Sequence, residues 1–342
     1  MKRLIFLLLG IGVSLGCLAW SMRETNLAEL KQAFANANYL TLPAMLALLF
    51  AFYWLKAIRW KWLLAPVQQF TTRELFAPVM TGFAANNILP AHLGEFVRVF
   101  FVRHRYGVPV GTVLSTVVLE RIFDVLAILA LFGIGLAYTD GMPPAQEKAA
   151  QLVGAGSAVV VVAVVIYLIW TETFISFMER CFALFPFLPG FLTRGITNML
   201  RKGADGLMAL KSAKAIILIS LNSMVQWLIN GMIAWIALRS FQIDVTPAAG
   251  LIVTGVTALG VTIPSTPGYF GVIQLCFSVA LQAQETRPDP SLVLGASVYY
   301  QLSMYIPVTV LGLYYLNQAG LSLSRLQSAA TSTEEGEQGK SV

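Results

Sequence analysis

The long uncharged stretches of this chain constrain its fold more than any other feature. Residues 245–284 contain no Asp, Glu, Lys or Arg, and neither do residues 4–22. About 20 consecutive apolar residues are enough for a helix to cross the hydrocarbon core of a bilayer. Charged residues make up 12% of the chain, roughly half of the share usual in soluble domains, and the mean hydropathy is +0.72. We therefore predict an all-α, polytopic integral membrane protein.

The same pattern divides the chain into about six full spans and two broken segments. We expect the spans at residues 4–22, 39–55, 107–138, 149–170, 215–238 and 291–317, and the broken segments at residues 75–94 and 245–284. Residues 171–214 are charged and contain apolar residues at helical spacing, which predicts a cytoplasmic connector with interfacial amphipathic helices. Residues 1–320 then form one transmembrane domain, and residues 321–342 a disordered cytoplasmic tail.

The distribution of basic residues predicts the orientation. If the N-terminus is cytoplasmic, most of the 23 Lys and Arg residues fall on the cytoplasmic side. Both termini are therefore expected inside. The net charge of +6 follows from this bias in the loops, so it gives no reason to expect a nucleic-acid partner.

The first broken segment is the most unusual stretch of the chain. Proline lacks the N–H that continues a helix, and glycine permits a turn or a close approach of the backbone. Non-helical backbone within a bilayer is tolerated only where protein or a wet cavity covers it. The segment is thus a candidate site, although a simple kink with an interfacial ion pair is the alternative. Its polar and helix-breaking residues are Asn86, Asn87, Pro90, Gly94, Glu95 and Arg98.

The second broken segment resembles the first. Residues 254–270 and residues 81–96 both begin with Thr-Gly and contain a proline followed four positions later by a glycine. The predicted topology brings them into the membrane from opposite sides, as in inverted-repeat transporters with a site near the midplane. The repeats would span residues 39–138 and 215–317. The candidate residues of the second break are Pro264, Pro267, Gly268, Gly271 and Gln274.

Three ionisable residues, Glu120, Arg121 and Asp124, lie well inside a predicted span. Each such charge costs roughly 2.5–3.5 kcal/mol on insertion scales. Arg121 and Asp124 can pair at i,i+3, so a structural ion pair is one interpretation. The other is a polar path that binds a charged group, with Arg98 or Arg121 as the cation that faces a phosphate.

Other polar features have plainer interpretations. Lys56, Arg59 and the nearby tryptophans are expected to form a belt at the membrane interface. Asn222, Gln226 and Asn230 follow one another at intervals of four, which favours hydrogen bonds between helices. Neither the cysteines nor the histidines have metal-ligand spacing, and the common catalytic motifs do not occur. We therefore expect no metal, no cofactor and no enzymatic activity.

Four motifs carry a resemblance to a known family: Arg59-Trp60 and residues 86–98, 120–124 and 263–274. Together they resemble the lysylphosphatidylglycerol synthase transmembrane-region family, also called flippase-like or UPF0104 proteins. The resemblance implies a helical membrane domain that acts on a phospholipid or a polyprenyl-phosphate-type lipid. Gln274 departs from the family pattern, which has a glutamate there, so coupling through that carboxylate is not expected. The resemblance does not extend to a soluble aminoacyl-transfer domain, and lysyl transfer is not expected.

Two main functions follow as expectations. The first is a flippase of the bacterial inner membrane that presents the two broken segments and the charged residues to a lipid headgroup. The second is a non-transporting scaffold whose partner is a membrane-bound glycosyl- or acyltransferase. An integral-membrane lipid transferase is a third alternative.

Overall fold

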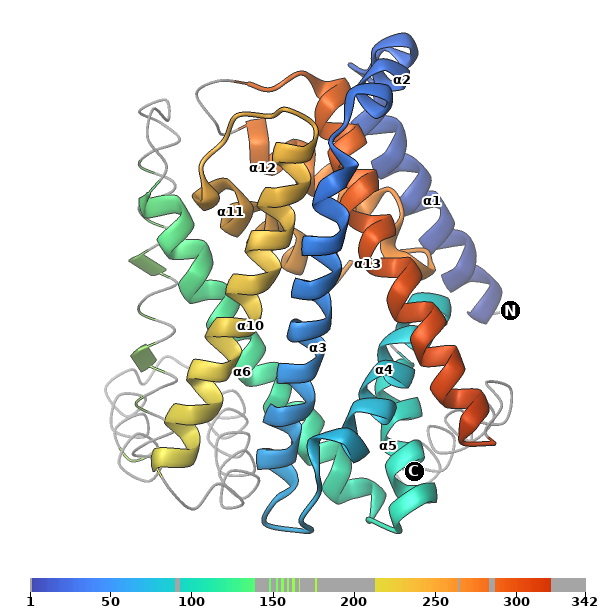
Figure 1. Cartoon of the computed structure of the whole chain (residues 1–342), viewed down its shortest axis with the longest axis vertical. Coiled ribbons are helices and arrows are strands. Elements are labelled where there is room, and N and C mark those ends of the chain that lie inside the picture. The colour runs from blue at the N-terminus through green and yellow to red at the C-terminus, as the bar shows by residue number, and fades with distance from the viewer. Residues whose placement is uncertain are drawn as a thin grey trace, which may run out of the picture.

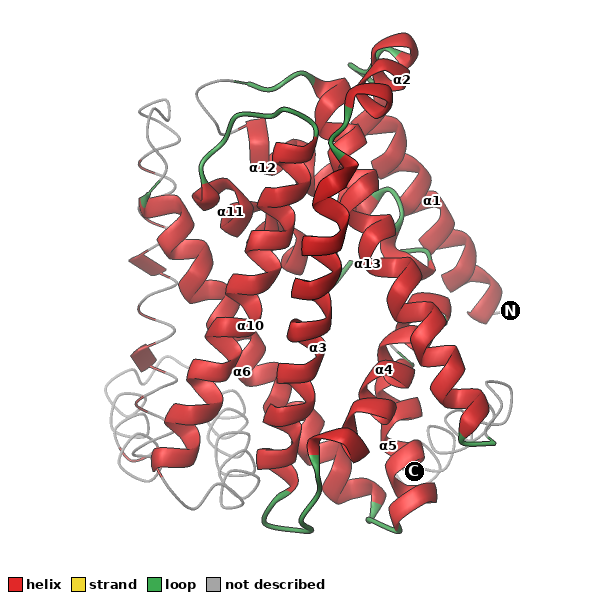
Figure 2. Cartoon of the chain, in the orientation of Figure 1, coloured by secondary structure: helices red, strands yellow, loops and turns green. Residues whose placement is uncertain are grey.

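The computed structural model describes residues 2–89, 93–138, 213–263, 265–282 and 287–320, together with isolated positions between residues 148 and 176. All regular secondary structure in these ranges is helical (Figure 2), in agreement with the all-α prediction. Pro90 and Pro264 lie outside the described residues, as do the predicted tail and nearly all of the predicted connector.

Ten α-helices and two short 3-10 helices follow one another in the described ranges. They are α1 (Lys2–Met22), α2 (Leu27–Asn36), η1 (Tyr39–Thr41), α3 (Leu42–Leu64), α4 (Thr72–Ile88), α5 (Gly94–Tyr106), α6 (Val110–Ala137), α10 (Ala213–Ser240), α11 (Pro247–Gly260), η2 (Pro267–Tyr269), α12 (Val272–Gln282) and α13 (Pro290–Gln318). Four long helices, α3, α6, α10 and α13, run through most of the height of the molecule (Figure 1).

Local sequence signals set several helix boundaries. The Thr71 hydroxyl accepts the Glu74 N–H, and the Glu74 carboxylate accepts the Thr71 N–H, so that α4 begins with a capping box. Helix α5 ends at its C-terminal cap, Gly107, which adopts a left-handed conformation with φ of 74°. Glycine is the usual residue there because it has no Cβ to clash.

Both broken segments are interrupted helices. Helix α4 ends at Ile88 and α5 begins at Gly94, while α11 ends at Gly260 and α12 begins at Val272. In each pair the two helices pack against each other, which gives two helical hairpins. The first lies in the lower half of the view and the second in the upper half (Figure 1). Helix α4 also contacts η2, so the two interrupted regions meet inside the molecule.

Two helical stretches are long and apolar enough to cross a membrane by length and composition, Tyr39–Leu64 and Lys214–Ser240. Shorter apolar helices are Gly10–Met22, Pro247–Gly260 and Val272–Gln282. Helices α6 and α13 contain 28 and 29 residues. At about 1.5 Å per residue each is longer than the ~30 Å hydrocarbon core. The predicted number of six full spans stays a prediction.

Candidate functional site

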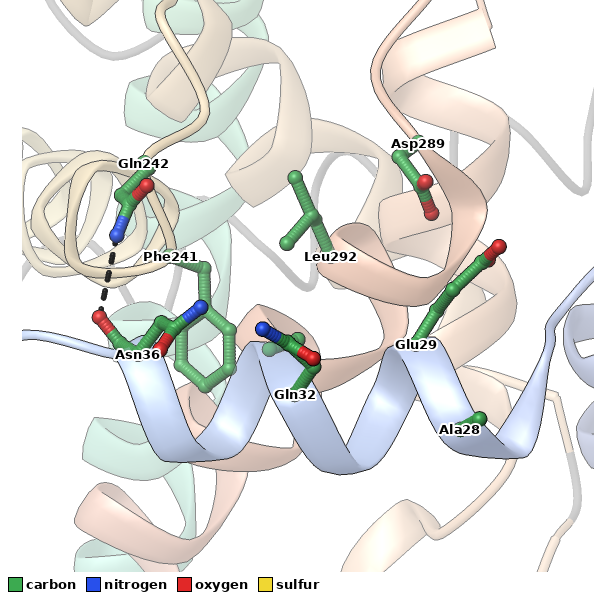
Figure 3. A pocket seen from close by; sticks show the side chains of 9 residues that line it. Ala28, Glu29, Gln32, Asn36, Phe241, Gln242, Asp289 and Leu292 are labelled. Atoms are coloured by element: carbon green, nitrogen blue, oxygen red, sulfur yellow. Dashed lines mark hydrogen bonds between the residues drawn. The ribbon is translucent and has the colours of Figure 1, made fainter.

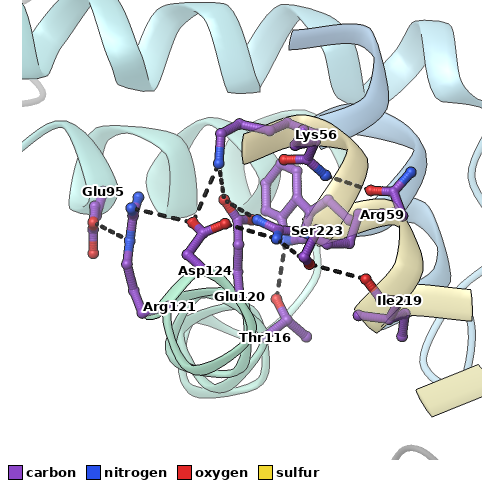
Figure 4. A network of polar contacts seen from close by, with 12 residues as sticks. Lys56, Arg59, Glu95, Thr116, Glu120, Arg121, Asp124, Ile219 and Ser223 are labelled. Atoms are coloured by element: carbon purple, nitrogen blue, oxygen red, sulfur yellow. Dashed lines mark hydrogen bonds and ion pairs between the residues drawn. The ribbon is translucent and has the colours of Figure 1, made fainter. Parts of the chain in front are cut away.

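A cluster of buried charges lies where α3, α5 and α6 meet. We define the charge cluster as Lys56, Arg59, Arg98, Glu120 and Asp124 (Figure 4). Each of these residues exposes 2% or less of its surface. Charges removed from water to this degree are stable only when they are paired and hydrogen-bonded.

Arg98 and Glu120 form a two-pronged ion pair between α5 and α6. The Arg98 Nη1 and Nη2 atoms lie 3.2 and 2.5 Å from the two carboxylate oxygens of Glu120. The Arg98 guanidinium also stacks over Trp60, 3.6 Å from the ring centroid. The Trp60 indole N–H in turn donates to the Thr116 hydroxyl at 3.0 Å. Arg98 is therefore held by two partners, Glu120 and Trp60.

Asp124 is the carboxylate on which the α3 cations converge. Arg59 Nη1 lies 2.8 Å from its Oδ1 atom, and Lys56 Nζ lies 3.2 Å from its Oδ2 atom. Arg59 also pairs with Glu120 at 3.3 Å. The Lys56 ammonium faces the rings of Phe52 and Trp227 at 5.1 and 5.7 Å from their centroids. Cation–π contacts of this kind help to stabilise a desolvated ammonium.

Helix α10 contributes two further hydrogen-bond partners to the charge cluster. The Trp227 indole N–H donates to Asp124 Oδ1 at 2.8 Å, and Arg59 donates to the Ser223 hydroxyl at 2.7 Å. The Ser223 hydroxyl in turn donates a hydrogen bond to the carbonyl of Ile219 in the preceding turn. The charge cluster thus ties the first half of the chain to the second.

Arg121 and Glu95 form a second, more open pair beside the cluster. Arg121 Nε lies 2.8 Å from Glu95 Oε1, and its Nη1 atom lies 3.5 Å from Asp124 Oδ2. Their side chains are 38% and 24% exposed, whereas those of the cluster are at most 3% exposed. Of the described cations in this region, Arg121 has the most exposed side chain.

The charges in this region do not cancel. The cluster contains three cations and two carboxylates, and the Arg121–Glu95 pair adds one charge of each sign. Among the described residues of this region, one positive charge is therefore in excess. The structure leaves Arg59 Nε and Arg98 Nε without hydrogen-bond partners, which fits a site rich in donors.

A central cavity of about 190 Å³ lies beside the charge cluster, between the two interrupted segments. Residues from α3, α4, α10, α11, η2, α12 and α13 line it. Trp227 belongs to both regions, because it lines the cavity and donates to Asp124. Asn87 comes from the first interrupted segment and Gly268 from the second, so the cavity lies where both halves of the chain meet.

Side-chain amides hold each interruption in place. Asn86 Oδ1 accepts the Gly94 N–H at 2.8 Å across the first break. Gln274 Oε1 accepts the Gly271 N–H at 2.6 Å, Gln274 donates to Gln301 at 2.6 Å, and Gln301 donates to the Gly268 carbonyl at 2.6 Å. Both of these glycines have positive φ, 77° for Gly268 and 87° for Gly271. Gln274 therefore stabilises the backbone of the second break through hydrogen bonds.

The residues predicted for the site divide into three groups. Glu95, Arg98, Glu120, Arg121 and Asp124 come together as ion pairs. Asn86, Gly94, Gly271 and Gln274 hold the breaks, while Asn87 and Gly268 line the central cavity. Pro267 begins η2 and is exposed. Pro90 and Pro264 cannot be assigned, as they lie outside the described residues.

The expected interface belt is wrong for Lys56, Arg59 and Trp60. Helix α3 continues to Leu64, and these three residues are buried against α5, α6 and α10. Their spacing of i, i+3 and i+4 in an otherwise apolar helix is the signal that could have revealed a common inward face. Ser223 and Trp227 gave no comparable signal.

The amide row on α10 also differs from expectation. Gln226 donates to Asn222 within the same helix. Asn230 alone makes the expected contacts between helices, because its Oδ1 atom accepts from Tyr300 at 3.1 Å and from Thr254 at 3.4 Å.

A second pocket of about 330 Å³ lies between α2 and the ends of α10 and α13 (Figure 3). Gln32 and Asn36 of α2, together with Phe241 and Gln242, form part of its wall. Its ionisable residues, Glu29 and Asp289, are both acidic, so it offers no cation to an anionic headgroup. Among the described residues, no three His, Cys, Asp or Glu side chains are grouped to hold a metal ion.

The model of the family "Lysylphosphatidylglycerol synthase TM region" matches residues 7–312. Glycosyltransferase AglD of Haloferax volcanii is 24% identical over 327 residues, which cover 86% of this chain and 50% of AglD. The chain thus spans about half the length of that relative.

A smaller relative matches over most of its own length. UPF0104 membrane protein MJ1078 of Methanocaldococcus jannaschii is 22% identical over 227 residues, or 66% of this chain and 90% of the relative. No solved structure matches. The family model covers the charge cluster, both interruptions and the central cavity, and this chain belongs to the lysylphosphatidylglycerol synthase transmembrane-region family.

Proposed function

We propose that this protein moves an anionic lipid, either a phospholipid or a polyprenyl-phosphate-type lipid, between the leaflets of the bacterial inner membrane. The observation that supports this most is the unbalanced positive charge beside the central cavity, which other molecules can reach at Arg121. A headgroup phosphate would supply the missing negative charge.

Arg121 is the better phosphate ligand of the two arginines considered from the sequence. Arg98 is buried and already bound by both oxygens of Glu120. Arg121 binds Glu95 through one nitrogen and lies 3.5 Å from Asp124 through another, and it remains partly exposed. A guanidinium matches phosphate geometry with two parallel hydrogen bonds, so a phosphate can replace Glu95 at Arg121.

The proposed architecture is an inverted repeat of residues 39–138 and 215–317, with about six full spans and both termini cytoplasmic. The two helical hairpins, α4–α5 and α11–α12, lie in opposite halves of the molecule and meet through α4 and η2. Interrupted helices that meet near the midplane are typical of transporters with alternating access. We propose that the chain transports lipid without modifying it chemically.

Reconstitution into liposomes tests this function. We expect the full chain to accelerate exchange of labelled phosphatidylglycerol between leaflets, and Arg121→Met to reduce that exchange at least tenfold. Arg103→Met is the matched control, because Arg103 is an exposed arginine near the end of α5, away from the cavity. Equal rates for the wild type and Arg121→Met would contradict the assignment of Arg121. No exchange of any anionic lipid would contradict the flippase function.

A scaffold for a membrane-bound transferase is the second candidate. The similarity to half of a protein named a glycosyltransferase favours it. Under this alternative the chain binds lipid but exchanges none, and a transferase co-purifies with it from native membranes. Lipid exchange by the purified chain alone would exclude this alternative as the main function.

A further inference from the structure

The lining of the central cavity differs in chemistry from the neighbouring charge cluster. No Asp, Glu, Lys or Arg occurs among the described residues that line the cavity. Its walls combine neutral hydrogen-bonding groups with the rings of tyrosines and Trp227. The charged region and the neutral region are adjacent, because Phe83 contacts Tyr53 of the cavity at 5.0 Å between ring centroids and lies 6.0 Å from the Arg121 guanidinium.

Four polar groups of the cavity lining have no hydrogen-bond partner within the described parts of the chain. The Thr257 hydroxyl is buried without one. Asn230 uses its oxygen for Tyr300 and Thr254, which leaves its amide N–H groups unused. Asn87 donates to Thr309 at 2.9 Å and leaves its carbonyl oxygen unused. The Tyr53 hydroxyl, on a side chain that is almost fully buried, makes no hydrogen bond to a described residue.

These four groups are a mixed set of donors and acceptors. The Asn230 amide nitrogen donates only, the Asn87 carbonyl oxygen accepts only, and the two hydroxyls can do either. Of the four, the Thr257 hydroxyl is buried without a partner, and a polar group in that state costs free energy. The cavity therefore favours an occupant with hydrogen-bonding groups of its own. Alcohol hydroxyls both donate and accept hydrogen bonds. A small molecule with several hydroxyls could therefore make the hydrogen bonds that water would otherwise make with these groups.

The aromatic walls and the size of the cavity restrict the occupant further. A volume of about 190 Å³ is below the ~300–1,000 Å³ of typical ligand pockets, so the cavity fits a headgroup fragment and not a whole lipid. The carbon skeleton of a polyol can pack on the tyrosine rings while its hydroxyls reach the amides. No carboxylate occurs among the described lining residues, so an ammonium group would meet aromatic rings there but no partner for an ion pair.

We propose that the central cavity binds the uncharged, hydroxyl-bearing part of the lipid headgroup, a glycerol or sugar moiety, while Arg121 binds its phosphate. This inference rests on the proposed function and specifies its substrate class. Substrate selection would then come from Asn87, Asn230, Thr257 and Tyr53, and charge recognition from Arg121.

Exchange assays with four lipids test this selection. The full chain is reconstituted with labelled phosphatidic acid, phosphatidylglycerol, phosphatidylethanolamine or a hexosyl-phosphoprenol. We expect the glycerol-bearing or the sugar-bearing lipid to exchange at least tenfold faster than both phosphatidic acid and phosphatidylethanolamine. The faster of the two hydroxyl-bearing lipids identifies the source of the polyol. Equal rates for all anionic lipids, or a preference for phosphatidylethanolamine, would overturn the inference.

Substitutions of residues that line the cavity test whether the cavity causes this lipid preference. We expect Asn230→Leu with Thr257→Val to lower the ratio of hydroxyl-bearing lipid exchange to phosphatidic acid exchange at least fivefold. Thr262→Val is the matched control, since Thr262 is exposed beyond the end of α11 and bonds the Leu259 carbonyl. If the double variant does not fold, Tyr53→Phe and Thr257→Val are measured singly, and each should lower the ratio. An unchanged ratio in folded variants would overturn the inference.

A binding measurement separates this inference from the transport function. Glycerol 1-phosphate or a hexose 1-phosphate should raise the unfolding temperature of the detergent-solubilised chain more than inorganic phosphate does. If the polyol phosphates raise the unfolding temperature more than inorganic phosphate does, but no lipid exchanges, the flippase function is contradicted. The inference that the cavity prefers hydroxyl-bearing headgroups would then still stand. Exchange with no preference for hydroxyl-bearing lipids, and no selective stabilisation, would leave transport intact and overturn the selection.

Discussion

Single side chains in the charge cluster have unequal roles. Asp124 accepts from Arg59, Lys56 and Trp227, so its loss would leave two buried cations with fewer partners. Glu120 is held by Arg98 and lies within 3.8 Å of the Lys56 ammonium. Arg121 contacts only the edge of this network, through Asp124. A structural ion pair and the arginine proposed to bind the ligand therefore lie on neighbouring turns of α6.

Removal of Asp124 should destabilise the protein strongly. We expect Asp124→Leu to cost about 3–5 kcal/mol, because it breaks a buried ion pair and leaves uncompensated cations. Adding Lys56→Met should recover much of this loss, since it removes one of the two buried cations that Asp124 compensates. Thermal unfolding in detergent, followed by the change in apparent molecular size, measures both variants.

The matched control for this pair is Asp124→Leu with Arg121→Met. It removes the same number of charges but leaves Lys56 and Arg59 facing a single carboxylate, so we expect little recovery. Equal recovery in the two double variants would show that the uncompensated Lys56 cation is not what destabilises Asp124→Leu.

At the scale of the elements, the interruption between α4 and α5 depends on close backbone contact. A Cβ atom at Gly94 would overlap the carbonyl oxygen of Gly82 and would lie 2.6 Å from the Asn86 amide oxygen. These two helices can approach this closely only because both contact positions are glycines. This close contact fixes where α5 lies, so that its residues Glu95 and Arg98 can pair with residues of α6.

Gly94→Ala should therefore destabilise the hairpin by roughly 1–3 kcal/mol, the usual range for overpacking in a core. Gly111→Ala is the control, because nothing lies within 4 Å of a Cβ atom at that position near the start of α6. We expect Gly111→Ala to be neutral or stabilising by up to about 1 kcal/mol, because alanine favours helix more than glycine does. If Gly94→Ala unfolds at the same temperature as the wild type, the close packing of α4 and α5 is not required.

At the scale of the whole molecule, the two halves of the chain are joined by buried polar contacts. Arg59 on α3 binds Ser223 on α10, and Asn87 on α4 binds Thr309 on α13. The central cavity lies among these contacts. Because Arg98 on α5 is held to α6 by Glu120, alternating access with an intact charge cluster would require the α11–α12 hairpin to move relative to α3, α6, α10 and α13.

The orientation in the membrane can be measured by labelling single cysteines. In a background without Cys17, Cys181 and Cys276, cysteines at positions 148 and 287 should react with an impermeant reagent from outside. Cysteines at positions 103 and 201 should react only after the membrane is permeabilised, because basic loops face the cytoplasm. Labelling of position 201 from outside would contradict both the orientation and the inverted repeat.

Sequence patterns alone determined the class of this protein and much of its layout. Long uncharged stretches required membrane helices, and the Pro and Gly residues near positions 90 and 264 predicted both interruptions. The same patterns located Glu120, Arg121 and Asp124 within a helix, and four motifs indicated the family. These features are local, so they can be read from neighbouring residues.

Only the tertiary structure decided which side chains these charges meet. The sequence assigned Lys56 and Arg59 to the membrane interface, whereas both are buried against Glu120 and Asp124. Arg98 likewise turned out to be held by Glu120, which leaves Arg121 as the accessible cation. In a membrane helix, the lipid-facing and protein-facing sides are both apolar, so hydrophobic periodicity does not identify the face that packs inward. That choice depends on contacts between helices far apart in the sequence.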